Sequence, residues 1–117
     1  MGSEMCIRDR DNILFPRFIE AHSHIDKSFT WEEFPNLRSN YDGALSINLQ
    51  EHKTRNTKKV LERAEKSLNL AIKNGYRAIR SHIDTYQNQG NDVWKDLFKL
   101  QKNILLSYNF NLLLFRL

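Results

Sequence analysis

Three short apolar segments alternate with two longer amphipathic segments, and this order limits the folds that the chain can adopt. The short segments have the length and composition of β-strands: residues 20–25, 76–83 and 110–117. The first long segment ends at Asn74-Gly75, a helix-stop signal, and the second begins at Asn91 or Asp92. This order predicts a parallel sheet, since each helix carries the chain back to the same edge.

The two predicted helices are expected to cover the sheet with their apolar faces, and Asn56 or Thr57 can cap the first of them. The apolar positions are Val60, Leu61, Ala64, Leu68, Ala71 and Ile72 in the first helix, and Val93, Leu97, Leu100 and Ile104 in the second. Residues 12–19 are expected to form an extended approach to the first strand. Residues 28–50 lack a sustained apolar period and are rich in Asn, Gly, Pro and Trp, so we expect a long loop there.

His22 and His24 stand two residues apart in the first predicted strand. Alternate side chains leave a strand on the same face, so both imidazoles are expected to point to one place. Neutral imidazole is the commonest side-chain metal ligand, and two of them can form half of a metal site. A His-x-His pair taken alone favours a polar, solvent-facing strand over a metal site, so its context decides.

The context is a His-x-His-hydrophobic-Asp-Lys run preceded by Pro-x-Phe-Ile-Glu, over residues 16–27. A second block, residues 74–84, reads Asn-Gly-Tyr-Arg-Ala-Ile-Arg-Ser-His-Ile-Asp. These blocks resemble the first and second barrel strands of the amidohydrolase superfamily, most closely those of cytosine deaminase and its relatives. Residues 50–73 then resemble the first barrel helix, and the resemblance extends over residues 14–117.

The resemblance implies an α/β fold, a partial (β/α)8 TIM barrel with about the first three strands and two helices. A complete barrel takes about 250 residues, and this chain has 117. Residues 12–117 are therefore interpreted as the N-terminal part of an amidohydrolase barrel domain. Residues 1–11 are interpreted as a non-native or disordered head, with a natural polar extension as the alternative.

The resemblance also implies a hydrolase that deaminates a cyclic amidine such as cytosine. One divalent metal ion, zinc or iron, would be held in part by His22 and His24 and would activate the attacking water. Triazine-type and other cyclic amides or amidines are the alternative substrates. The family's proton-shuttling glutamate and remaining ligands come from later strands, so no catalytic residue is expected in this chain, and the chain alone is expected to be inactive.

Five further residues are candidates for roles beside the metal or the substrate. Asp26 and Lys27 could pair with each other and fix the loop, or contact substrate. Arg80 and Asp84 could likewise pair or orient substrate. His82 could hydrogen-bond a metal ligand, or pack at the barrel rim. The aromatic residues are expected to cover a core and not to stack on a base: Trp31, Trp94 and Phe98.

The composition, 40% hydrophobic and 27% charged, fits a globular chain. The net charge of +4 is concentrated in residues 52–59, which a solvated, mixed-charge approach to a helix explains. No nucleic-acid-binding module is present, so we expect a small-molecule partner, a pyrimidine or related heterocycle, and no nucleic acid.

No segment reaches about 18 apolar residues, and no secretory signal is visible. The single cysteine, Cys6, excludes an internal disulfide. These features predict a cytoplasmic protein without a membrane partner, and homo-oligomer formation by the full-length enzyme is left open. The alternative to a hydrolase is a non-catalytic basic protein or a nonfunctional truncated product.

Overall fold

The computed structural model describes residues 15–84 and 90–116, and it places a parallel sheet beneath two helices. Its elements in chain order are β1 (Phe18–Ser23), a short 3-10 helix η1 (Ile25–Lys27), α1 (Tyr41–Thr54), α2 (Thr57–Lys73), β2 (Tyr76–Ile83), α3 (Gly90–Tyr108) and β3 (Asn111–Arg116). The three strands are parallel and lie in the order β1-β2-β3. The predicted α/β class and parallel sheet are confirmed.

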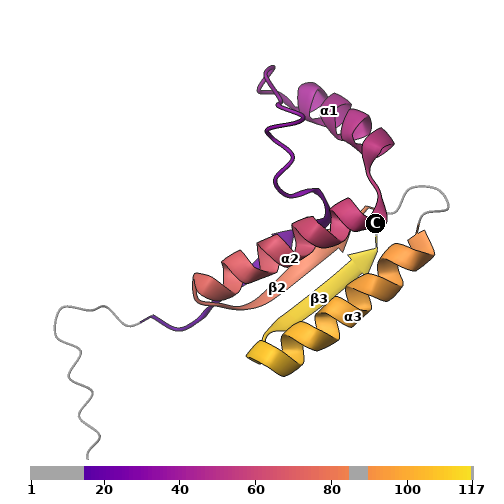
Figure 1. Ribbon diagram of the computed structural model, residues 1–117. Coiled ribbons are helices and arrows are strands. Elements are labelled where there is room, and N and C mark those ends of the chain that lie inside the picture. The colour runs from indigo at the N-terminus through magenta and orange to yellow at the C-terminus, as the bar shows by residue number, and fades with distance from the viewer. Residues whose placement is uncertain (1–14, 85–89, 117) are drawn as a thin grey trace, which may run out of the picture.

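The core lies between one face of the sheet and the helices α2 and α3, which pack side by side on that face (Figure 1). Strand alternation on β2 buries Ile79 and Ile83 toward the helices. The predicted helix faces are confirmed: Val60, Ala64, Leu68, Val93, Leu97 and Ile104 are buried, and Leu61, Ala71, Ile72 and Leu100 pack around them. Leu112 of β3 and Phe110, which directly precedes that strand, complete the core.

The opposite face of the sheet is open in the described part of the chain. Arg80 and His82 of β2 stand beside Leu113 and Phe115 of β3 in the parallel register. The side chains of Leu113 and Phe115 are 49% and 44% exposed. Large apolar side chains therefore gather on an exposed face of the sheet.

The ends of α2 follow the predicted local signals. Asn56 caps the N-terminus, and its side-chain oxygen accepts a hydrogen bond from the Lys59 amide at 3.0 Å. At the other end, the Asn74 amide donates to the Leu70 carbonyl at 3.1 Å. Gly75 then adopts a φ of 82°, the left-handed conformation that glycine tolerates best.

Replacing Gly75 with alanine is expected to lower the free energy of unfolding by about 1–2 kcal/mol, the cost of a left-handed non-glycine residue. A Cβ atom at Gly75 would meet no heavy atom within 4 Å, so the backbone alone sets this cost. Urea unfolding followed by circular dichroism measures the change. Glu65→Ala, at an exposed position in the middle of α2, is the control and should change stability by less than about 0.5 kcal/mol. Equal stability of Gly75→Ala and wild type would contradict the prediction.

The predicted loop over residues 28–50 is wrong in its second half, where α1 begins at Tyr41. The side chain of Asn40 caps this helix and accepts from the Gly43 amide at 2.8 Å. Apolar periodicity did not reveal α1, because its only buried residues are Gly43 and Glu51. Figure 1 shows α1 standing apart from the sheet, beyond the end toward which β2 points.

A single helix over residues 50–73 is also wrong. Arg55 and Asn56 separate α1 from α2, and both have extended backbone conformations. The break turns the Arg55 side chain inward, where it is 6% exposed, so the interpretation of residues 52–59 as a wholly solvated basic cluster is corrected.

The strand and helix limits differ from the predicted ones by a few residues. β1 ends at Ser23, so His24 follows the strand and precedes η1. α3 begins at Gly90, before the predicted Asn91 or Asp92. The predicted head, residues 1–11, lies outside the described residues, as do residues 12–14 and 117. Within the described ranges, every helix is too short or too polar to cross a membrane.

Candidate metal centre

Three histidines gather at the carboxyl end of the sheet: His22 of β1, His24 just after β1, and His82 of β2. The ring centroids of His22 and His24 are 5.3 Å apart. His82, at the end of β2, stacks on His22 with a centroid distance of 4.4 Å and lies 5.9 Å from His24. The predicted convergence of His22 and His24 therefore extends to His82, because β1 and β2 run parallel and end at the same edge.

The histidine cluster, His22, His24 and His82, offers donor atoms suited to a divalent metal ion. The Nδ1 atoms of His24 and His82 are buried, and neither has a hydrogen-bond partner within the described structure. Imidazole nitrogen is a preferred ligand of zinc and iron. Among residues 15–84 and 90–116, however, no three His, Cys, Asp or Glu side chains are placed to hold an ion together. The described cluster fits part of a metal site and lacks the rest of a ligand set.

Lys27 and Asp84 form an ion pair beside His24. The Lys27 ammonium donates to Oδ2 of Asp84 at 2.5 Å. The other carboxylate oxygen, Oδ1, lies 3.8 Å from Nδ1 of His24, beyond hydrogen-bond distance. The pair joins the segment after β1 to the residue after β2, and so holds the two strand ends together next to the histidine cluster.

This pairing corrects two predicted ion pairs. Lys27 contacts Asp84 and not its neighbour Asp26, because the parallel strands bring residues 27 and 84 together. Arg80 does not pair with Asp84 either. It lies earlier on β2, on the open face, where its guanidinium is 5.5 Å from the ring centroid of Phe115.

Asp26 is fully buried and connects three parts of the chain. Its Oδ2 accepts from Nη1 of Arg55 at 3.2 Å and from the backbone amide of Asp84 at 3.1 Å. Arg55 also donates from Nε to Oε2 of Glu51 at 2.8 Å. Burial makes each of these charges dependent on its partners, because an unpaired charge away from water is very unfavourable.

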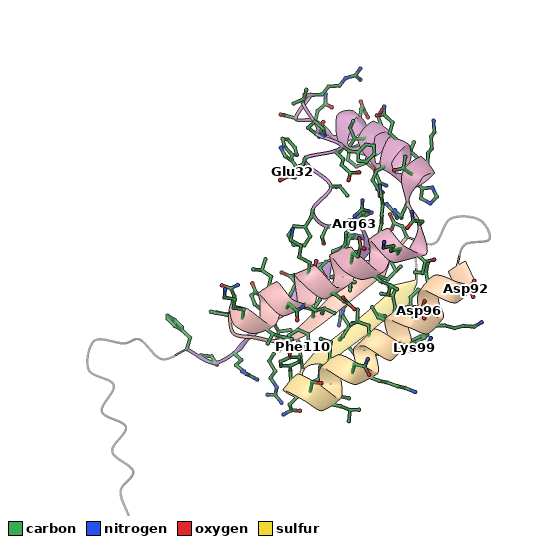
Figure 2. The ribbon with its side chains drawn as sticks, in the orientation of Figure 1. Glu32, Arg63, Asp92, Asp96, Lys99 and Phe110 are labelled. Atoms are coloured by element: carbon green, nitrogen blue, oxygen red, sulfur yellow. The ribbon has the colours of Figure 1, made fainter. Side chains whose placement is uncertain are left out.

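Arg63 completes this buried charge cluster, which comprises Asp26, Glu51, Arg55 and Arg63. Its Nη1 donates to Oε1 of Glu51 at 2.5 Å and to the Asp26 carbonyl at 3.3 Å. Figure 2 shows Arg63 on the side of α2 that faces α1 and the segment before it. The cluster therefore ties α1, α2 and η1 together directly after His24. Sequence reasoning missed Glu51 and Arg55, although their i, i+4 spacing on α1 was a usable signal.

The buried charges shift the pKa values of the cluster in different directions. Burial raises the pKa of Asp26. Burial would also raise the pKa of Glu51, but hydrogen bonds from Arg55 and Arg63 outweigh it, so the pKa of Glu51 falls. For Asp84 the hydrogen bond from Lys27 outweighs burial in the same way and lowers the pKa.

Burial, and then the positive charge of Lys27, lower the pKa of His24. We expect NMR titration of the metal-free chain to show His24 titrating at a lower pH than an ordinary histidine. Because the folded state favours neutral His24, stability is lost as the pH falls through this pKa. Lys27→Met should raise the pKa of His24, although burial should keep it below that of an ordinary histidine. Lys95→Met, at an exposed position on α3, is the control and should leave the pKa of His24 unchanged. An ordinary pKa for His24 in the wild-type chain would contradict the prediction.

A cleft of about 590 Å³ lies between α1 and the segment that follows β1. We call it the α1 cleft, and its lining includes His24, Lys27, Trp31, Phe34, Tyr41 and Leu45. Trp31 is 63% exposed, so the prediction that it covers a core is wrong. Phe98 is also largely exposed, whereas Trp94 packs against the core.

Comparison with known proteins finds a similarity to a deaminase. No protein-family model matches the chain. A curated pterin deaminase from Rhizobium rhizogenes is 30% identical over 112 residues, covering 86% of this chain and 26% of the relative. The chain thus spans about a quarter of the length of that relative, and it is similar to the corresponding part of a deaminase.

Proposed function

We propose that this chain is the N-terminal part of a metal-dependent hydrolase that deaminates a heterocyclic amidine. Water adds to the ring carbon that bears the amino group, the exocyclic C–N bond breaks, ammonia leaves, and a ring carbonyl forms. The observation that carries the proposal is the histidine cluster at the shared carboxyl end of two parallel strands. The similarity to a pterin deaminase favours a pterin-like ring over cytosine or a triazine.

The fold supports a place for residues 12–117 at the start of a (β/α)8 barrel. Three parallel strands in sequential order, with α2 and α3 on one face of the sheet, match the layout of successive barrel units (Figure 1). The open face with Arg80, His82 and Phe115 would then line the barrel interior. Its exposed apolar side chains would be covered by strands contributed from further along such a barrel.

We propose that His22 and His24 hold one zinc or iron ion. That ion would supply an activated water for hydrolysis. The lowered pKa of His24 keeps its imidazole neutral, the form that binds metals. His82 lies against His22 and fixes its ring orientation, and the pair of Lys27 with Asp84 holds the strand ends beside His24. The remaining ligands and the proton-shuttling glutamate would come from residues outside this chain.

Ammonia release by the full-length enzyme tests the proposal. With zinc or iron restored, we expect ammonia from pterin at a higher rate than from cytosine, and none after removal of the metal with a chelator. The 117-residue chain alone should release none. A full-length enzyme that holds its metal and releases ammonia from neither heterocycle would overturn the proposed reaction.

A further inference from the structure

Aromatic side chains that line the α1 cleft are unusually exposed to solvent. Trp31 and Tyr41 are 63% and 79% exposed, and Leu45 is 46% exposed. Large apolar side chains gathered around a hollow, and not dispersed over the surface, are typical of a ligand site. The volume of about 590 Å³ is sufficient for a one- or two-ring heterocycle.

The polar groups at the cleft include both hydrogen-bond donors and acceptors. The Oδ1 atom of Asn48 accepts from Nη2 of Arg55 at 3.3 Å, which fixes the Asn48 amide. The Oδ1 atom of Asn36 is buried and has no hydrogen-bond partner within the described structure. Lys27 contributes an ammonium group, held in place by Asp84. Ring carbonyls and ring nitrogens accept hydrogen bonds, and ring N–H and amino groups donate them, so the donors and acceptors of the cleft suit an oxo-substituted nitrogen heterocycle.

His24 belongs to both the histidine cluster and the wall of the cleft. A ring held in the cleft therefore has one edge next to the proposed metal site. The buried charge cluster keeps this geometry, because Glu51 lines the cleft while its carboxylate binds Arg55 and Arg63.

We propose that the α1 cleft binds the substrate's heterocyclic ring, with Trp31 as its main stacking surface and Tyr41 beside it. This inference rests on the proposed function and adds the residues that select a flat, oxo-substituted ring. Stacking on an aromatic side chain contributes enough affinity for alanine substitution to weaken binding roughly tenfold to a hundredfold.

Pterin binding to the 117-residue chain, followed by the fluorescence anisotropy of pterin, is the test. Trp31→Ala should weaken binding roughly tenfold to a hundredfold. Ala44→Trp, which fills the cleft from an exposed position on α1, should abolish it. Trp94→Phe, in α3 and away from the cleft, is the matched control and should bind pterin as the wild type does.

The same titration on His22→Ala separates this inference from the proposed function, because His22 is a proposed metal ligand that does not line the cleft. Pterin binding that depends on Trp31 and persists without His22 supports the cleft, even if the metal proposal fails. Absence of pterin binding to the folded wild-type chain overturns the cleft, whatever the histidines bind. Equal weakening by Trp31→Ala and Trp94→Phe overturns it as well. Circular dichroism of each variant establishes that it is folded.

Discussion

Replacing Arg55 with methionine is expected to lower the free energy of unfolding by about 3–5 kcal/mol, the usual effect of removing one partner from a buried ion pair. Arg55 is 6% exposed and donates hydrogen bonds to both Asp26 and Glu51. Asp26 is 0% exposed and Glu51 is 2% exposed, so water cannot solvate either carboxylate in place of Arg55. Methionine fills a similar volume, which confines the loss to charge and hydrogen bonding.

Urea unfolding of wild type and variant, followed by circular dichroism, measures this difference. Lys58→Met is the matched control, because Lys58 pairs with Glu62 at 3.9 Å with side chains 86% and 64% exposed. Lys58→Met should lower the free energy of unfolding by less than about 1 kcal/mol. Arg55→Lys keeps the charge but loses the planar guanidinium donors. Its effect on the free energy of unfolding should lie between the effects of Arg55→Met and Lys58→Met. A change below about 1 kcal/mol for Arg55→Met would show that the cluster is not buried as described.

Replacing His22 or His24 with alanine is expected to weaken zinc binding by the full-length enzyme by more than about a hundredfold. Loss of a residue that only orients a ligand typically costs ten- to a hundredfold, and loss of a ligand itself costs more. His82→Ala should fall in that lower range, because His82 stacks on His22 and is proposed to orient it. Ammonia release should fall in parallel with bound metal.

Competition with a calibrated chelator measures the three affinities, and metal analysis gives the bound stoichiometry. His52→Ala, on α1 outside the histidine cluster, is the control and should retain wild-type metal content. Unchanged affinity in both His22→Ala and His24→Ala would remove the metal site from this end of the sheet. A loss in His82→Ala as large as in the other two would make His82 a ligand.

Much of the sheet and of its helical cover followed from the sequence alone. β2 was predicted over its observed range, residues 76–83. Asn56 was one of two predicted caps for the start of α2, and Gly75 was predicted at its end. These signals are local, because strand alternation, helical periodicity and caps each depend on residues within a few positions. The parallel order then placed His22, His24 and His82 at one edge.

Contacts between distant residues decided what sequence reasoning missed. Asp26 is 29 residues from Arg55 and 58 from Asp84, yet both bind its carboxylate. No local pattern reports such pairs, so the break after α1, the burial of Arg55 and the pairing of Lys27 with Asp84 emerged only in the tertiary structure. The α1 cleft arose in the same way, since α1 has almost no buried apolar face to mark it. The sequence determined the strands, the covering helices and the edge where the histidines meet, because these depend on short-range periodicity; tertiary packing determined the charges and the cleft around them, because only folding brings those residues together.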